Sequence, residues 1–199
     1  MPKHPIVLSK INESSNVQQH LEQLSGVNAT RRQVQTAVGS ITRQLLEADY
    51  IPNSANTVLV PVLRAGLAMW PAAAEFFDYP EAILAEGVKS RQNNKSEVHF
   101  RKLINLKDKD LVILDPIIAT GGTLVETIDY LQHKPVGSIA VLSCYAAPQG
   151  LDSINSAHPE VQIVAGSLAE EVDELGYLIP PTNGDIGDKL FGREEKNEQ

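Results

Sequence analysis

One segment of the chain reads Asp115-Pro116-Ile117-Ile118-Ala119-Thr120-Gly121-Gly122-Thr123 and directly follows the apolar residues 111–114. An apolar strand that is buried on both faces tolerates an acid only at its end, where the acid meets water or a ligand. The two adjacent glycines let main-chain N–H groups converge without obstruction by a Cβ atom, and the two threonines add hydroxyl donors. A helix that begins here adds partial positive charge at its N-terminus. The segment therefore predicts an anion-binding strand–loop–helix unit.

Two other phosphate-binding loops do not fit this segment. The lysine of a Gly-x-x-x-x-Gly-Lys-Ser/Thr loop is missing, and no Gly-x-Gly-x-x-Gly opens a helix. An ordinary tight turn stays open as an alternative, because a glycine pair after a strand is by itself a weak signal. The location favours a ligand, since open α/β sheets bind ligands at the carboxyl ends of parallel strands.

The rest of the chain alternates apolar strands with amphipathic helices. Strands are expected at residues 57–63, 81–85, 111–114, 137–145 and 161–164, and helices at residues 29–49, 67–77, 123–133 and 148–157. In the first of these helices Thr30 is a candidate N-cap, and apolar residues recur at helical spacing. The polar residues 86–99 contain few helix signals and are expected to form a mobile loop. This alternation predicts an α/β fold in which helices flank a mainly parallel central sheet.

Composition limits the possible functions. The 199 residues fit a single domain, and hydrophobic residues make up 42% of them, which suffices for a sizeable core. The formal net charge of −8 argues against a nucleic-acid partner, which would need a surface that neutralises phosphates. No run approaches the ~20 apolar residues of a membrane span, and the N-terminal residues lack the apolar run of a signal peptide. We therefore expect a cytoplasmic protein without a nucleic-acid or membrane partner.

Cysteine and histidine offer no convincing reactive centre. Cys144 lies inside an apolar run, which favours a buried strand residue over a nucleophile. None of the five histidines is paired with another ligand at the spacing of a metal site. We therefore expect no zinc or iron site that the protein holds by itself.

Three segments together resemble one enzyme family. Residues 114–123 resemble the phosphoribosyl-diphosphate motif of type I phosphoribosyltransferases, in the Asp-Pro and Ala-Thr-Gly-Gly version of uracil phosphoribosyltransferases. Residues 63–69 (Leu-Arg-Ala-Gly-Leu-Ala-Met) resemble the diphosphate loop of that family. Residues 176–180 together with residues 184–192 resemble its C-terminal pyrimidine-binding segment. The segments occur in the order of the family, and the resemblance covers nearly the whole chain.

The resemblance implies a pentosyltransferase with the type I phosphoribosyltransferase fold. Its single domain, residues 1–199, would consist of a core at about residues 30–165 and a small hood from the two ends of the chain, with base-binding residues at about 166–192. The implied reaction transfers the 5-phosphoribosyl group from phosphoribosyl diphosphate to N1 of uracil and yields UMP and diphosphate, a step of pyrimidine salvage. Such chemistry depends on positioning and charge stabilisation more than on a side-chain nucleophile.

The same resemblance assigns roles to residues that bind phosphoribosyl diphosphate. The candidate catalytic residues are Arg64, Asp115 and Asp185. Arg64 would hold the diphosphate, because its guanidinium presents a fork of donors, and Asp115 would hold the ribose hydroxyls. Further residues expected to contact this substrate are Ala65, Gly66, Arg91, Ala119, Thr120, Gly121, Gly122 and Thr123. For Arg64 the alternative interpretation is a surface salt bridge.

The base, the metal ion and the oligomeric state are also expectations from the resemblance. One wall of the base pocket would consist of Tyr177, Leu178, Ile179, Pro180 and Gly184. Mg²⁺ would arrive with phosphoribosyl diphosphate and contact Asp185 directly or through water, without a cage supplied by the protein alone. A homodimer or a higher homo-oligomer is expected.

Two segments depart from the family pattern and keep other functions open. The family usually reads Pro-Gly-Leu-Gly-Asp where residues 180–185 read Pro-Pro-Thr-Asn-Gly-Asp, and Pro181 has no N–H with which to contact a uracil carbonyl. In residues 87–92, Arg91 stands one position later than the arginine of the family, and the acids of the family are missing. Further candidate cations are Lys89, Lys95 and Arg101. The alternatives are a phosphoribosyltransferase for another base or heterocycle, or a non-catalytic regulatory homologue that binds phosphoribosyl diphosphate or a nucleotide.

Overall fold

The computed structural model describes residues 6–7, 17–25, 28–48, 50–51, 54–89, 96–101, 104–172, 174, 178–179 and 185–192. The strands are β1 (Ile6–Val7), β2 (Thr57–Leu63), β3 (Glu81–Ala82), β4 (Leu84–Lys89), β5 (Ser96–Arg101), β6 (Asp110–Leu114), β7 (Ile117–Ile118), β8 (Ser138–Ala146), β9 (Gln162–Leu168), β10 (Glu171–Val172) and β11 (Leu178–Ile179). The helices are α2 (Val17–Ser25), α3 (Arg31–Glu47), the 3₁₀ helix η1 (Ala65–Ala68), α4 (Trp70–Phe76), α5 (Gly122–Gln132), α6 (Pro148–Ala157) and α7 (Ile186–Phe191). Within these ranges no helix has both the length and the apolar character that a bilayer crossing requires.

Most of the strands join one large sheet. Its order is β1-β9-β8-β6-β2-β4-β5, and β3 and β7 add short pairings with β2 and β8. Every pairing in this sheet is parallel except β4 with β5, which is antiparallel. A second, two-stranded antiparallel sheet pairs β10 with β11. The prediction of an α/β fold with a mainly parallel central sheet is confirmed.

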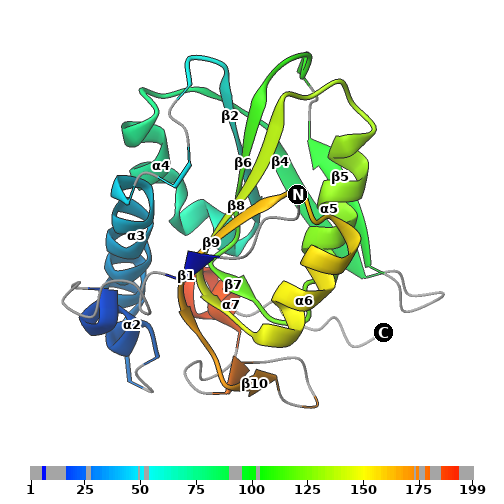
Figure 1. Ribbon diagram of the computed structural model, residues 1–199. Helices are drawn as coiled ribbons and strands as arrows, with labels where there is room; N and C mark the ends of the chain where they lie inside the picture. Colours follow the sequence, from blue (N-terminus) through cyan, green and yellow to red (C-terminus); the bar gives the residue numbers. More distant parts are fainter. Residues whose placement is uncertain are drawn as a thin grey trace, which may run out of the picture.

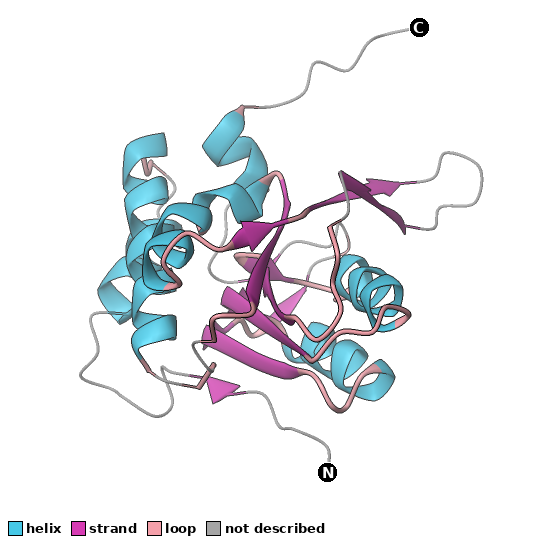
Figure 2. Cartoon of the chain, turned by 90° about the horizontal axis from the view of Figure 1, so that it is seen from above, coloured by secondary structure: helices cyan, strands magenta, loops and turns pink. Residues whose placement is uncertain are grey.

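Helices cover both faces of the large sheet. Figure 1 shows α2, α3 and α4 on one face and α5 and α6 on the other, and Figure 2 shows the strands between the two groups of helices. Successive strand residues therefore enter two separate cores. In β6, Val112 and Leu114 belong to the core under α3, whereas Leu111 and Ile113 belong to the core under α5. Burial on both faces explains why these strands are continuously apolar.

Helix α3 illustrates how local sequence signals set an element. Thr30 accepts a hydrogen bond from the Gln33 main-chain N–H at 3.3 Å, and the Gln33 side chain accepts one from the Thr30 N–H at 2.9 Å. This reciprocal capping box satisfies main-chain donors that the first helical turn leaves unpaired. Val34, Ile41 and Leu45 recur on the buried face of the helix. The predicted helix at residues 29–49 is therefore confirmed, with Thr30 as its N-cap.

The chain breaks its strand pairing at the acid that follows β6. Pro116 lacks a main-chain N–H and cannot continue the ladder, so β6 and β7 become two strands that both pair with β8. Opposite the break, the N–H groups of Cys144 and Tyr145 both donate to the Pro116 carbonyl at 3.1 Å. Two residues of β8 therefore face one residue of the neighbouring chain segment, which is the arrangement of a β-bulge, and a β-bulge bends a strand locally. The bulge and the proline together place Asp115 at the carboxyl edge of the sheet.

The structure corrects the prediction for residues 86–99. They were expected to form a mobile loop, but residues 86–89 and 96–99 belong to the antiparallel pair β4–β5, while residues 90–95 lie outside the described residues. The signal for β5 was an alternation of polar and apolar residues, in which Glu97 and His99 are exposed and Val98 and Phe100 are partly buried against the core. Because this strand is at the edge of the sheet, its polar half resembles a loop in composition.

Two element boundaries also differ from the predictions. The helix expected at residues 67–77 is divided into η1 and α4, and α4 carries Pro71 in its first turn, where a missing N–H is tolerated. The strand expected at residues 161–164 continues to Leu168, because its pairing with β8 extends to Ala146 and Leu168. The other predicted helices and strands agree with the structure to within two residues at each end, except the strand expected at 81–85, which is β3 followed by β4.

Helix α6 begins directly against the loop after β7. A Cβ atom at Gly150 would lie 2.3 Å from the Ala119 carbonyl oxygen and 2.8 Å from Ile118 Cγ2. On the other side of this contact Gly121 has φ of +81°, and a Cβ there would lie 2.7 Å from the Gly150 carbonyl oxygen. Both glycines are therefore required for the close packing of the loop on α6.

Replacement of Gly150 by alanine tests this packing. We expect Gly150→Ala to lower the free energy of unfolding by about 1–3 kcal/mol through overpacking, although alanine favours a helix. The matched control is Gly39→Ala in α3, where a Cβ would meet nothing within 4 Å and should raise stability by about 0.5–1 kcal/mol. Urea unfolding of both variants measures the difference. Equal stabilisation by the two substitutions would contradict the proposed close contact.

Candidate functional site

Two loops meet at the carboxyl edge of the central strands. The loop after β2 begins with Arg64, and the loop after β6 begins with Asp115. A Cβ at Gly66 would lie 2.3 Å from the Leu114 carbonyl oxygen, so the two loops pack main chain against main chain. The peptide bond between Leu63 and Arg64 is cis. The structure thus brings Arg64 and Asp115, which are 51 positions apart (115 minus 64), to the same edge.

The loop between β7 and α5 surrounds a small cavity. Its volume is about 110 Å³, and its walls are Asp115, Ile117, Ile118, Ala119, Thr120, Gly121, Gly122, Thr123 and Leu124. Gly121 is the N-cap of α5, and within the described residues no side chain caps this helix end. The unpaired N–H groups of the first helical turn therefore lie at the cavity wall, unlike those of α3. A cavity at an uncapped helix N-terminus suits an anion such as a phosphate.

Asp115 has an unusual electrostatic environment. Burial raises the pKa of its carboxyl to about 7, and the neighbouring Asp185 carboxylate raises it as well. A hydrogen bond from the Ile117 main-chain N–H, at 3.3 Å, opposes the shift because it favours the ionised form. The contribution of Asp185 to this pKa indicates that the start of α7 lies near Asp115. Two repelling carboxylates would be relieved by a proton or by a bound cation.

Helix α7 holds the C-terminal segment against the loop after β2. The Asp185 side chain caps this helix by accepting a hydrogen bond from the Asp188 N–H at 3.0 Å. The Asp188 side chain accepts a hydrogen bond from Arg64 Nη2 at 2.7 Å, and the Gly192 carbonyl accepts one from Arg64 Nη1 at 3.0 Å. Arg64 therefore forms a salt bridge, as the alternative interpretation expected, but its partner belongs to the candidate site.

Strand β4 runs close to the side chain of Thr123, one of the residues that line the cavity. A Cβ at Gly87 would lie 3.0 Å from the Thr123 methyl group, so only a residue without a side chain fits easily there. On the adjoining strand, Arg101 donates to Glu86 through Nε at 3.2 Å and Nη2 at 2.7 Å. Of the candidate cations near this strand pair, Arg101 is thus engaged by Glu86, while Arg91 and Lys95 lie outside the described residues.

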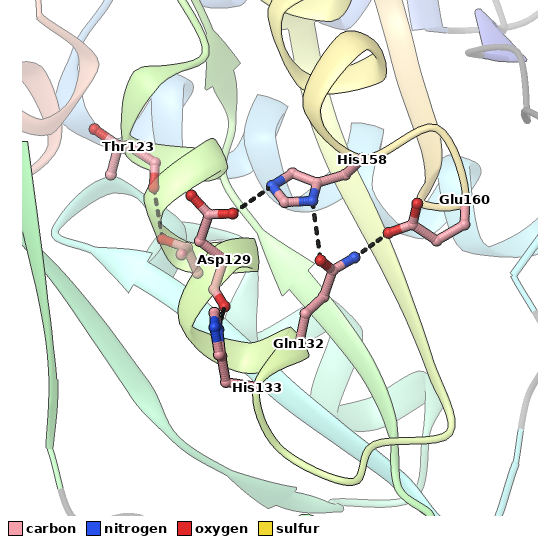
Figure 3. A network of polar contacts seen from close by, with 7 residues as sticks. Thr123, Asp129, Gln132, His133, His158 and Glu160 are labelled. Carbon is pink, nitrogen blue, oxygen red and sulfur yellow. Dashed lines mark hydrogen bonds and ion pairs between the residues drawn. The ribbon is translucent and has the colours of Figure 1, made fainter.

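Helix α5 is anchored to α6 far from the cavity. Figure 3 shows His158 between the side chains of Asp129 and Gln132, and Gln132 in contact with Glu160. His158 Nδ1 lies 3.1 Å from Gln132 Oε1, and Nε2 lies 3.2 Å from Asp129 Oδ1 without the alignment of a hydrogen bond. Because His158 is buried, this network fixes the end of α5 relative to α6. The rigid helix in turn fixes the loop at its N-terminus.

Cys144 is a core residue and not a candidate nucleophile. Its side chain is fully buried in β8. Burial, and to a smaller extent the nearby Asp115 carboxyl, raises the pKa of the thiol well above its ordinary value. A thiol in this environment stays protonated and unreactive at neutral pH.

The predicted base-binding residues are described only in part. Tyr177, Pro180 and Gly184 lie outside the described residues. Residues 181–183, which differ from the family pattern, also lie outside them. Leu178 and Ile179 form β11, which pairs with β10, and the Leu178 side chain is buried in the core under α3. A contact between Leu178 and a base would therefore involve its main chain.

Sequence reasoning missed α7 and its Asp188. The signals were present, because Asp185 is a favourable N-cap, Ile186 and Leu190 are four residues apart, and Gly192 follows the helix. The helix was not expected because residues 184–192 were interpreted as part of a pyrimidine-binding segment. Asp188 has no sequence signal of its own, since its partner Arg64 is 124 residues away.

Comparisons with known proteins identify the family and the fold of the chain. The family model described as uracil phosphoribosyltransferase matches residues 15–193. The AQ2163 protein from Aquifex aeolicus superimposes with a TM-score of 0.82 at 25% identity, covering 94% of this chain and 98% of the other.

Two further solved structures share the fold. Adenine phosphoribosyltransferase from Trypanosoma brucei, solved with AMP, pyrophosphate and ribose-5-phosphate, has a TM-score of 0.60 at 11% identity and covers 87% and 86% of the two chains. Purine phosphoribosyltransferase from Pyrococcus horikoshii has a TM-score of 0.54 at 19% identity and covers 78% and 92%.

The raised pKa of Asp115 predicts a pH-dependent stability. Because the folded protein binds this proton more tightly than the unfolded chain, the free energy of unfolding should fall as pH rises from about 4 to about 7. Asp115→Asn should remove this dependence and stabilise the free protein at pH 8 by about 1–3 kcal/mol. Carboxyl NMR titration and urea unfolding at pH 5 and pH 8 measure both effects.

Two further variants complete this test. Asp185→Asn should lower the pKa of Asp115, because one of the two repelling charges is removed. Asp152→Asn, on the exposed side of α6, is the control and should leave the titration of Asp115 unchanged. An Asp115 carboxyl that titrates near pH 4 in the wild-type protein would contradict the electrostatic description of the site.

Proposed function

The chain belongs to the uracil phosphoribosyltransferase family, whose model matches residues 15–193, and we propose that it transfers the 5-phosphoribosyl group to uracil. Its chemistry is phosphoribosyl transfer. The observation that carries the proposal is the cavity of about 110 Å³ at the uncapped N-terminus of α5, with Arg64 and Asp115 at the same sheet edge. The substrates would be phosphoribosyl diphosphate and uracil, and the products UMP and diphosphate.

The cavity would hold the 5′-phosphate of the ribose. Main-chain N–H groups at the start of α5 and the hydroxyl groups of Thr120 and Thr123 are the donors that support this role. Asp115 at the cavity wall would accept hydrogen bonds from the ribose hydroxyls. These contacts would fix the sugar on one side while leaving C1′ accessible to the base.

The diphosphate would lie toward Arg64 and the main chain of Ala65 and Gly66. In the reaction the bond from C1′ to the diphosphate oxygen breaks, and the diphosphate leaves with the electron pair. N1 of uracil then bonds to C1′ and releases its proton. A guanidinium fork suits the charge that builds up on the departing diphosphate.

The acids of the site fit a divalent cation that comes with the substrate. Asp185 lies close enough to Asp115 to raise its pKa, and carboxylate oxygens are the ligands that Mg²⁺ prefers. Within the described residues no three His, Cys, Asp or Glu side chains form a metal-binding group, so the other ligands would come from diphosphate and water. Bound Mg²⁺ would neutralise part of the charge of the diphosphate.

Residues 181–183, which differ from the family pattern, support a second candidate function, the same transfer to another base. Pro181 has no N–H to donate to a carbonyl of the base, so the acceptor can differ from uracil. Diphosphate release measured with a panel of pyrimidines and purines separates the two candidates. Uracil as the preferred acceptor supports the first candidate, and preference for another base supports the second.

The activity itself has a direct test. Purified protein with phosphoribosyl diphosphate, Mg²⁺ and labelled uracil should form labelled UMP. Folded protein that forms no product at millimolar substrate would overturn uracil transfer. Tight binding of phosphoribosyl diphosphate without turnover on any base would instead favour a regulatory role.

Substitution of Arg64 tests its role in the transfer. We expect Arg64→Ala to lower kcat/KM by about 10²–10³-fold, because a donor to the developing charge is lost. Arg64→Lys keeps the charge but loses the fork and should be intermediate. The control is Arg43→Ala, which breaks the exposed ion pair of Arg43 with Glu75 between α3 and α4 and should leave kcat/KM unchanged. Equal activity of Arg64→Ala and wild type would remove Arg64 from the mechanism.

A further inference from the structure

The guanidinium of Arg64 is held by groups from the far end of the chain. Nη2 donates to Asp188 Oδ1 at 2.7 Å, and Nη1 donates to the Gly192 carbonyl at 3.0 Å. Both partners belong to α7 or to the residue that ends it. A long side chain on a loop would otherwise sample several rotamers, so these two contacts define where its donors point.

Asp188 is itself held in place by the residue that begins α7. Its main-chain N–H donates to Asp185 Oδ1 at 3.0 Å. Gly187 lies between Asp185 and Arg64 and leaves no room for a side chain. A Cβ at this position would lie 2.9 Å from Asp185 Oδ1 and 3.8 Å from Arg64 Nη2. Asp185, Asp188 and Arg64 are therefore one connected unit, and a shift of one would move the others.

The ion pair contributes little to folding stability. The Arg64 and Asp188 side chains are 37% and 31% exposed, and pairs as exposed as this contribute about 0–1 kcal/mol. The pair does restrict the orientation of the Arg64 guanidinium plane, because it includes a charge-assisted hydrogen bond of 2.7 Å. The contact is thus better suited to orienting Arg64 than to holding the fold together.

The ion pair also leaves Arg64 able to bind a ligand. A guanidinium has five N–H groups, and the contacts with described residues use two of them. Its three other N–H groups have no partner among the described residues, and they are the candidate donors to an anion at the edge of the sheet. Arg64 can therefore keep Asp188 as its partner while it binds diphosphate.

From this geometry we infer that Asp188 is a positioning residue, which orients Arg64 for the diphosphate of the substrate. The inference rests on the proposed function, because it takes the diphosphate as the ligand of Arg64. Asp188 itself would not touch the substrate. It acts by presenting the free donors of Arg64 in a fixed direction before the substrate arrives, which lowers the entropy cost of binding.

The test measures binding of inorganic diphosphate with Mg²⁺ by calorimetry, a measurement that needs no base. Asp188→Ala should raise Kd about tenfold, the effect of losing one well-oriented charge-assisted contact. Asp188→Asn keeps an oxygen acceptor at the same position and should recover most of the affinity. Glu75→Ala, which breaks the Arg43–Glu75 pair, is the matched control and should leave Kd unchanged.

A double-mutant cycle distinguishes positioning from a general effect on α7. If Asp188 acts through Arg64, Asp188→Ala should not change Kd further in an Arg64→Ala background. Equal losses in both backgrounds would overturn the inference, because the effect would then not pass through Arg64. A lower Kd in Asp188→Ala would also overturn it, because Asp188 would then compete with diphosphate for the guanidinium.

Failure of this inference differs from failure of the proposed function. If the affinity for diphosphate depends on Arg64 and Asp188 as expected but the wild-type protein transfers ribose phosphate to no base, the proposed function is overturned and this inference stands. If Arg64→Ala binds diphosphate with the same Kd as the wild-type protein, the inference is overturned. In active protein, KM for phosphoribosyl diphosphate should rise about tenfold in Asp188→Ala, while KM for the base stays the same.

Discussion

The loops after β2 and β6 pack main chain against main chain, and the arrangement of the site depends on this contact. No side chain fits between Gly66 and the Leu114 carbonyl, and the contact between Gly121 and Gly150 imposes the same limit on the other side of the loop. Main chain that is packed in this way cannot adjust by changes of rotamer. The central strands therefore determine the relative positions of Arg64, Asp115 and the start of α5.

The charge distribution at this edge is unfavourable in the free protein. Asp115 and Asp185 repel each other in a chain whose formal net charge is already −8. A raised carboxyl pKa means that ionisation of Asp115 costs free energy in the folded protein. This destabilising contribution lies at the site where a ligand is expected. Arg64 reduces the local negative charge through Asp188. An anionic substrate that carries its own divalent cation fits such a surface better than a bare anion does.

The central strands could be predicted from the sequence because a strand that is buried on both faces is a continuous run of apolar residues. Residues 57–63 and 111–114 are continuously apolar and form central strands, and Thr30 indicated the start of α3. The β4–β5 pair was missed because an edge strand needs only one apolar face, so alternation of Glu97, Val98 and His99 replaced a continuous run. Local composition is therefore most informative where tertiary burial is complete.

The candidate site was predicted in its local parts and missed in its long-range contacts. The Asp115–Thr123 loop lies within nine residues (123 − 115 + 1), so its shape follows from a proline, two glycines and a helix start. The ion pair of Arg64 with Asp188 joins residues 124 positions apart, and neither side chain carries a local mark of its partner. A residue that orients another one is visible only when the fold brings them together.

The same separation has a consequence for how the protein matures on the ribosome. Synthesis proceeds from the N-terminus, and domains generally begin to fold before the chain is finished. Every strand of the large sheet lies at or before Leu168, whereas α7 spans Ile186–Phe191. The sheet and the cavity at the start of α5 can thus assemble on a nascent chain while Arg64 still lacks Asp188 as its partner. The contact that orients Arg64 forms only when the C-terminal helix emerges and docks, so in the order of synthesis the sheet precedes the ion pair of Arg64 with Asp188.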